Sequence, residues 1–301
     1  MAAIPLFRTA GAAPGALRLT PAIAVLAMAA SAAGVLLPGT YAEEAPAWAA
    51  QATGQDLVNL LLVYPFLLAL ARLARRGSLP AYLAWLGLLG YTAYSYLIYA
   101  GYTRFSAMFP LYVAVLALSG WGLVAGLLPL RPDMVATAFR NAPMRLAGSW
   151  LVLFGAGYAA LELAVVAGAV LGGVPPASAV AAGLPTDPVL VLDLAFVLPG
   201  MAACGLLVRR RRAAALLLAV PALAFSTAMG VAVLNMLVVT GLRLPPFPTV
   251  VVAGFVLITA GHATVLARVL RAMHPGVRLA GAVEPRRPAR EDRPAATVRV
   301  S

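Results

Sequence analysis

The sequence contains no lysine, so all 22 of its basic side chains are arginines. A chain without lysine cannot form a Schiff base with retinal or pyridoxal phosphate, and it has no lysine nucleophile. It has only one cysteine, Cys204, and two histidines, which are too few for the usual zinc or iron–sulfur ligand sets. A lone cysteine also cannot form an internal disulfide. We therefore expect no metal site and no cofactor.

Charged residues are scarce as well. They make up 11% of the 301 residues, whereas hydrophobic residues make up 62%. A soluble domain is roughly half apolar and about a quarter charged, so lipid must solvate much of this chain. The formal charge of +12 would suggest nucleic acid in a soluble protein, but arginine at helix ends explains it as a topology signal. We expect no nucleic-acid partner.

Eight apolar windows are long enough to cross about 30 Å of hydrocarbon, which takes roughly 20 residues. They are 17–37, 56–74, 81–102, 108–130, 147–171, 189–208, 213–239 and 249–267. They predict an all-α polytopic transmembrane helical bundle of about eight spans within residues 17–272. Residues 1–16 precede this domain, and the Arg- and Pro-rich tail 273–301 is predicted to be disordered. A cleavable signal peptide is the alternative interpretation of the first window.

Arginines occur at alternate ends of these windows. Twenty of the 22 lie on the side that both termini share, and only Arg104 and Arg243 lie on the other. The positive-inside rule then places both termini in the cytoplasm. We expect the basic ends and tail to contact anionic lipids at the cytoplasmic face. The alternative for the tail is a solvated terminus that only helps to set topology.

A weak internal repeat relates the two halves at an offset of 134 residues. Pro65 precedes Arg75 by ten residues, as Pro199 precedes Arg209 by ten. Both windows also carry a carboxylate toward their outer end, Asp56 in one and Asp193 in the other. Because four is an even number of spans, such a 4+4 repeat would be parallel rather than inverted. Coincidence between helices that run the same way is the alternative.

Ionisable side chains inside a bilayer are costly, and each needs a physical reason. Glu162 lies near the middle of the fifth window, one helical turn after Tyr158, and Asp193 lies some five residues into the sixth. Asp56 lies at the outer boundary of the second window, where we expect water to reach it. A polar, mainly acidic chamber is predicted in the outer half of the bundle. Its candidate residues, which would hold a small molecule or cation, are Asp56, Asn59, Tyr94, Tyr99, Arg104, Tyr158, Glu162, Asp193 and Asn235.

Each of these residues also has an alternative interpretation in which its role is only structural. A neutral Glu162 can join two helices, and buried tyrosines can be interhelical packing with hydrogen bonds. His262 is a candidate proton relay, and a hydrogen bond to Thr259, three residues earlier, is its structural alternative. Arg104 and Arg243, the two outer arginines, are the expected partners of the carboxylates.

Three segments resemble a family of bacterial multi-pass inner-membrane proteins that has no assigned function. They are Leu184–Pro199 (LPTDPVLVLDLAFVLP), Gly54–Leu60 (GQDLVNL) and the tyrosine-rich third window. The resemblance implies a location in a bacterial inner membrane, and it carries over no catalytic residue.

The leading functional hypothesis is a transporter or ion-coupled permease with an outward-facing pocket of carboxylates and tyrosines. A membrane-embedded enzyme or accessory subunit acting on lipid or quinone is the second hypothesis, and a signalling or assembly scaffold is the third. No Walker-type loop, GxSxG elbow or HExxH helix occurs in the sequence, which favours a protein that is not an enzyme.

Overall fold

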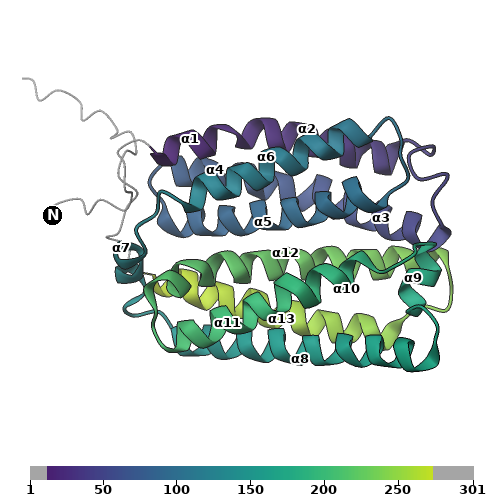
Figure 1. Ribbon diagram of the computed structural model, residues 1–301. Coiled ribbons are helices and arrows are strands. Elements are labelled where there is room, and N and C mark those ends of the chain that lie inside the picture. The colour runs from purple at the N-terminus through teal and green to yellow at the C-terminus, as the bar shows by residue number, and fades with distance from the viewer. Residues whose placement is uncertain (1–11, 274–301) are drawn as a thin grey trace, which may run out of the picture.

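A computed structural model describes residues 12–273 of the chain. The predicted N-terminal segment 1–16 and the predicted tail 273–301 lie largely outside the described residues. Within residues 12–273 all long elements are helices, which confirms the predicted all-α bundle (Figure 1). The elements in chain order are α1 (Ala12–Arg18), α2 (Thr20–Leu36), α3 (Pro46–Val58), α4 (Tyr64–Arg75), α5 (Leu79–Tyr102), α6 (Phe109–Leu127), α7 (Pro132–Ala136), α8 (Met144–Gly172), α9 (Ala177–Ala182), α10 (Pro188–Leu192), α11 (Leu198–Arg209), α12 (Ala213–Arg243) and α13 (Thr249–Ala272).

Seven helical segments of the described chain are long and apolar enough to cross a membrane, so the chain is a multi-pass membrane protein. They are Gly15–Leu36, Pro46–Arg75, Phe109–Leu127, Met144–Gly172, Pro188–Arg209, Ala213–Arg243 and Thr249–Ala272. The predicted count of eight is wrong by one. The exception is α5, which has 24 residues but lower hydropathy because it contains six tyrosines. Most of its side chains are buried, so these tyrosines meet protein rather than lipid.

Two of the long segments contain a five-residue π-helical turn at matching positions. Asn59–Val63 joins α3 to α4, and Asp193–Val197 joins α10 to α11. A proline is the second residue after each turn, at Pro65 and Pro199. Proline lacks an amide hydrogen, and its ring crowds the carbonyl group four residues earlier, so a wider turn accommodates it. The two turns lie 134 residues apart, as the two prolines do, and the residue that corresponds to Asp193 is therefore Asn59 rather than Asp56.

The same offset matches the α1–α2 segment with α8 and α5 with α12. The fourth long helices, α6 and α13, correspond in order, but α13 begins six residues later than the offset places it. In each half the first long segment packs against the second and the fourth, and the third packs against the same two. Figure 1 shows these halves as an upper and a lower layer that meet along α5 and α12. The predicted 4+4 repeat therefore describes the packing as well as the sequence pattern.

The halves approach most closely where α5 crosses α12. A Cβ atom added at Gly87 would lie 2.5 Å from the Pro221 carbonyl oxygen and 2.7 Å from the Ala224 Cβ. Gly87 and Pro221 correspond to each other at the 134-residue offset, so each half contributes the same position to this contact. Away from it the symmetry is lost, because α3 packs along α12 whereas its counterpart α10 touches α5 only lightly.

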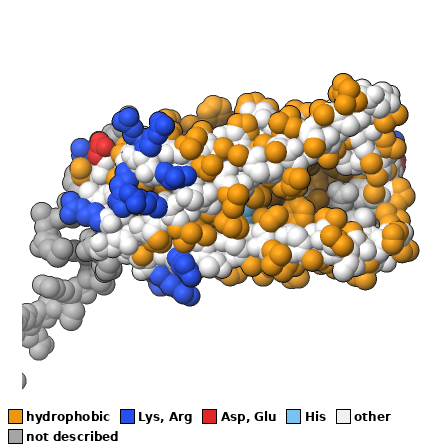
Figure 2. Space-filling view, turned by 90° about the horizontal axis from the view of Figure 1, so that it is seen from below, with side chains coloured by type: hydrophobic (Ala, Val, Ile, Leu, Met, Phe, Trp, Pro, Cys, Tyr) orange, Lys and Arg blue, Asp and Glu red, His pale blue; other side chains and the backbone are white. Residues whose placement is uncertain are grey.

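Basic side chains gather at one end of the bundle. Figure 2 shows them at one end of the face, while a hollow flanked by hydrophobic side chains lies toward the other end. The arginines that end or follow helices here are Arg72, Arg75, Arg76, Arg131, Arg140, Arg145, Arg209, Arg210, Arg211, Arg212, Arg268 and Arg271. In the following sections this end is called the arginine end, and the opposite end is called the outer end.

Candidate functional site

The predicted acidic chamber divides into two separate clusters of polar side chains. Asp56 belongs to the first cluster, inside the N-terminal half. Glu162 and Asp193 belong to the second, where α8 lies beside the π-helical turn that begins at Asp193 and α10 touches α5. Helix α5 contributes tyrosines to both clusters. Tyr94 and Tyr99 are five residues apart and point about 140° away from each other around the helix. The sequence placed both in the outer half of the bundle but could not assign them to different neighbours.

In the first cluster, the Asp56 carboxyl group is 2% exposed. It accepts hydrogen bonds from the hydroxyl groups of Tyr41, at 2.6 Å, and Tyr99, at 3.3 Å. A Cβ atom added at Gly34 would collide with this carboxyl group, so glycine leaves the room that it occupies. The prediction that water reaches Asp56 is wrong, because α3 begins at Pro46 and carries the residue about 15 Å into the bundle.

Tyr41 closes this cluster from the loop between α2 and α3. Burial, together with the negative charge of Asp56, raises the pKa of the Tyr41 phenol well above its usual value. The phenol therefore stays a neutral hydrogen-bond donor. We missed Tyr41 in the sequence because it lies outside every apolar window.

A chain of hydrogen bonds extends the first cluster along α3 and α5. The Gln55 side-chain amide donates to Ser95 Oγ at 2.8 Å and to the Tyr91 hydroxyl at 3.4 Å. Tyr91 donates in turn to Asn59 Oδ1 at 2.8 Å. Gln55 and Ser95 were not predicted, although Gln55 precedes Asn59 by one helical turn and would have been recognised had the helix been extended to its true start. These bonds fix α3 to α5.

The second cluster lies where the two halves meet. The Tyr94 hydroxyl donates to Asp193 Oδ1 at 2.8 Å, and the Tyr94 ring packs edge-on against Phe225 at 5.7 Å between ring centroids. Phe225 is the counterpart of Tyr91 and has no hydroxyl group. The first half therefore supplies, through Tyr94, the hydrogen bond that Asp193 would otherwise lack, as Tyr91 does for Asn59.

Glu162 of α8 completes this acidic pair. Its side chain is 7% exposed, and its Oε2 atom has no hydrogen-bond partner in the described chain. The charges that act on it are those of Asp193 and Asp187, both negative. A buried carboxyl group without a positive partner must either carry a proton or bind a cation. Glu162 and Asp193 thus have the acidic character that was predicted for the chamber in the outer half of the bundle. They are only two of the nine residues that were predicted to form it.

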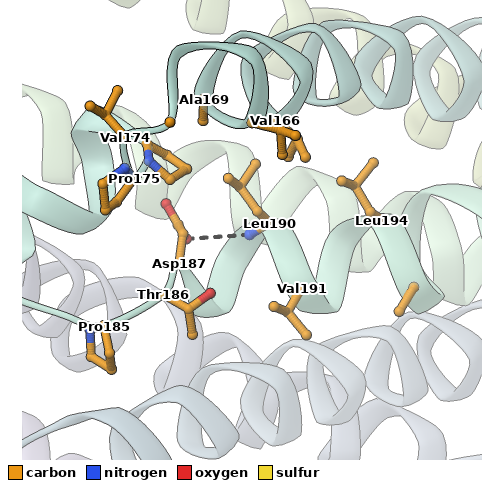
Figure 3. A pocket seen from close by; sticks show the side chains of 14 residues that line it. Val166, Ala169, Val174, Pro175, Pro185, Thr186, Asp187, Leu190, Val191 and Leu194 are labelled. Carbon is orange, nitrogen blue, oxygen red and sulfur yellow. Dashed lines mark hydrogen bonds between the residues drawn. The ribbon is translucent and has the colours of Figure 1, made fainter.

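An open groove of about 800 Å³ runs between α8 and α10 toward this acidic pair. Val166, which lines it, is one turn from Glu162, and Leu194, which also lines it, follows Asp193 directly. Figure 3 shows the apolar side chains of the two helices facing each other across the groove, with Asp187 at its mouth. Asp187 Oδ1 caps α10 by accepting hydrogen bonds from the Val189 amide at 2.9 Å and the Leu190 amide at 3.3 Å.

Asn235 and the two outer arginines do not join either carboxyl group. Asn235 donates to the Gly54 carbonyl oxygen at 2.6 Å and ties α12 to α3. Arg243 donates to the Thr53 hydroxyl at 3.2 Å. Arg104 is exposed, and only its backbone amide binds an acidic side chain, that of Glu44 at 2.6 Å. The prediction that these arginines pair with the membrane carboxylates is wrong, because both stay at the outer surface, where water solvates their charge.

Tyr158 lies in an aromatic contact between α8 and α13 rather than in the acidic pair. Its ring stacks on Phe154 at 5.5 Å and packs edge-on against Phe255 at 6.2 Å. Tyr158 precedes Glu162 by one turn and therefore lies on the same face of α8.

His262 is buried in the same contact, at 1% exposed. Its Nδ1 atom accepts a hydrogen bond from the Trp150 indole at 2.9 Å. An indole N–H can only donate, so the proton of the neutral ring lies on Nε2, which has no partner in the described chain. The structural alternative that named Thr259 is wrong, because the Thr259 hydroxyl also has no partner. This geometry favours a packed neutral ring over a proton relay, which would need a partner on each nitrogen.

A smaller pocket of about 350 Å³ lies at the arginine end, between α2 and α4. Arg72, Arg75 and Arg76 line it on one face of α4. Arg75 donates to the Leu17 carbonyl oxygen at 2.8 Å, an acceptor left free because Pro21 has no amide hydrogen. Arg72 and Arg76 keep their charge available to a ligand.

Within residues 12–273, no three histidine, cysteine or acidic side chains gather in a way that could hold a metal ion. No protein-family model, curated protein or solved structure matches the chain.

Proposed function

We propose that this chain is a transporter whose two four-helix halves move relative to each other around Glu162 and Asp193. The observation that carries the proposal is the position of this acidic pair. Asp193 lies at the junction of the halves, where it accepts a hydrogen bond from Tyr94, and Glu162 lies behind it on α8. Neither has a positive partner, and the lining of an open groove reaches residues next to both. Proton or cation binding there would change the charge at the junction and thereby the preferred arrangement of the halves.

The two π-helical turns support such a movement. Each lies in the middle of a long segment, and π-helical turns are common at functional sites and bends in helices. Asp193 begins one of these turns, so its charge state acts directly on the turn. The resemblance to bacterial inner-membrane proteins and the positive-inside rule both support a location in that membrane, with the arginine end and both termini in the cytoplasm.

The pH dependence of stability tests the role of Glu162. Above about pH 5 a glutamate in the unfolded chain is ionised, whereas ionising the buried side chain costs free energy. The folded state therefore loses stability as the pH rises, and we expect the melting temperature of the purified wild type to fall from about pH 5 to about pH 9. In Glu162→Gln this fall should be clearly smaller.

Glu43→Gln is the matched control, because Glu43 is an exposed carboxylate in the outer loop. Its pH profile should follow that of the wild type. If Glu162→Gln lowers the melting temperature equally at every pH, the carboxyl group serves only to hold helices together, and the scaffold hypothesis replaces the transporter.

We also propose that the pocket between α2 and α4 binds the phosphate group of an anionic lipid. Each arginine near an anionic membrane surface contributes about 1 kcal/mol to the free energy of binding to that surface. The double variant Arg72→Gln/Arg76→Gln should therefore lose about 2 kcal/mol of the stabilisation that phosphatidylglycerol gives over phosphatidylcholine in nanodiscs. Arg131→Gln/Arg140→Gln removes the same charge from the same end. Equal losses in the two variants would point to general electrostatic attraction and rule out a specific pocket.

The groove also favours a second candidate function, an enzyme or accessory subunit that acts on lipid or quinone. Its walls are mostly apolar. Two of the side chains that line it, Val170 of α8 and Val191 of α10, are 73% and 47% exposed, in helices that would face lipid. Such a protein would bind a neutral apolar ligand whether or not Glu162 is present.

A further inference from the structure

We infer that the groove between α8 and α10 binds an amphipathic organic cation, a molecule with an apolar body and one diffuse positive charge. The inference rests on the proposed function, since it names the ligand class for the acidic site at which the transporter would bind its substrate. Three properties of the groove carry it: its apolar walls, the acidic groups in its lining (Asp187) and just beyond it (Glu162 and Asp193), and the absence of cationic side chains from its lining.

The walls suit an apolar body. Nearly all the side chains that line the groove are aliphatic or proline, with Val166, Val170 and Val174 on one side and Leu190, Val191 and Leu194 on the other. The volume of about 800 Å³ lies within the usual range for small-molecule sites. A ligand with aromatic or alkyl groups would fill this space by displacing lipid or disordered water.

The acidic groups suit a positive charge. Asp187 lies at the mouth of the groove, and only its Oδ1 atom is used in capping α10. Asp193 accepts one hydrogen bond, from Tyr94, through Oδ1. Glu162 is more than nine-tenths buried, and its Oε2 atom has no partner in the described chain. The charges of Asp187 and Asp193 both act on Glu162, so the three carboxyl groups share one electrostatic field.

Neither an anion nor a metal ion fits this arrangement. The lining of the groove includes no arginine, and the described arginines other than Arg104 and Arg243 lie at the arginine end. An anion would therefore meet only like charge. A divalent cation needs several oxygen ligands close together, and the described side chains form no such set. An organic cation spreads its charge over a larger volume and is satisfied by carboxylates a few ångströms away.

The probe that tests this is radiolabelled tetraphenylphosphonium, measured by equilibrium binding to the purified full-length chain in nanodiscs. We expect saturable binding of this cation. Tetraphenylborate, which has the same shape and the opposite charge, is measured in a separate experiment because the two ions pair in solution, and it should show no saturable binding. Glu162→Gln and Asp187→Asn should each weaken binding by about tenfold, because each removes one negative charge at or next to the groove. Asparagine is as good a helix N-cap as aspartate, so Asp187→Asn leaves α10 intact.

A pair of tryptophan variants locates the site. Val166→Trp should fill the groove and abolish saturable binding. Leu161→Trp adds the same ring on the same helix at a side chain that is 64% exposed and does not line the groove, so it should bind the probe like the wild type. The inference is overturned if tetraphenylborate, measured separately, binds saturably with the same affinity, if no saturable binding of tetraphenylphosphonium occurs, or if Val166→Trp binds like Leu161→Trp.

Failure of this inference is distinguishable from failure of the proposed function. The pH profile of the melting temperature is measured without any ligand. If Glu162→Gln flattens that profile while tetraphenylphosphonium does not bind, the inferred ligand class is wrong. The proposal that Glu162 binds a proton in a transporter is then still supported. The opposite result is saturable, charge-selective binding together with the same pH profile in Glu162→Gln and the wild type. It supports the inferred ligand class and contradicts the proposal that Glu162 binds a proton.

Discussion

Replacing Gly87 with alanine is expected to destabilise the folded protein by about 1–3 kcal/mol, even though alanine has the higher helix propensity. The added methyl group would lie 2.5 Å from the Pro221 carbonyl oxygen and 3.1 Å from the Phe225 amide nitrogen. Both atoms belong to the backbone of α12, which cannot rotate away as a flexible side chain does. The two halves would have to separate at the contact that joins them.

Gly90→Ala is the matched control, three residues further along α5. A Cβ atom there would meet its nearest neighbour, the Phe225 ring, at 3.7 Å, which is ordinary van der Waals contact. This variant should be neutral or more stable by up to about 1 kcal/mol through helix propensity alone. Thermal unfolding of the two variants in the same detergent measures the difference. Equal melting temperatures would mean that α5 and α12 do not approach each other this closely.

Asp56→Ala is expected to cost about 2–4 kcal/mol of unfolding free energy. The change leaves the buried Tyr41 hydroxyl without its acceptor, weakens the bonding of Tyr99, and empties the space beside Gly34. Asp56→Asn keeps an acceptor oxygen of the same shape and should cost clearly less. Denaturant titration of both variants measures these values.

Asp133→Ala provides the comparison, because Asp133 is exposed at the arginine end and should change stability by no more than about 0.5 kcal/mol. A double-mutant cycle with Tyr41→Phe adds a further check. If Tyr41→Phe and Asp56→Ala are additive, the 2.6 Å hydrogen bond between them contributes nothing to stability, and the first cluster does not hold the loop to the bundle.

Much of the fold was predictable because it depends on single residues in contact with lipid or water. The apolar windows matched helices, and the helix ends at 172, 209 and 213 lie within one or two residues of the predicted ones. Arginine marks the boundary at 209–213, and the glycines and prolines at 172–176 mark the end of α8, which explains this accuracy. The helix whose start was predicted least accurately is α3. Polar residues from Gln51 to Asp56 interrupt its apolar pattern, so hydropathy gave no sign that the helix begins at Pro46.

The candidate site was predictable in its residue types but not in its contacts. Glu162 and Asp193 were recognised from their cost in a bilayer, and Tyr94 from its depth. Their hydrogen bonds depend on the rotation of each helix about its axis, which is set by the packing of its neighbours. That rotation sends Tyr99 to Asp56 and Tyr94 to Asp193, and it leaves Asn235 on the Gly54 carbonyl group.

The sequence by itself determined the class of protein, the all-α bundle, the arginine end and the 134-residue offset, because these follow from hydropathy, charge and proline spacing along the chain. Only the tertiary structure decided how the surroundings of equivalent residues in the two halves differ. Asn59 and Asp193 begin equivalent π-helical turns, yet Asn59 is buried and accepts a hydrogen bond from Tyr91 of α5, whereas Leu194, next to Asp193, lines an open groove. The physical reason is that α3 packs along α12 while α10 barely touches α5, and no local property of either segment encodes that difference.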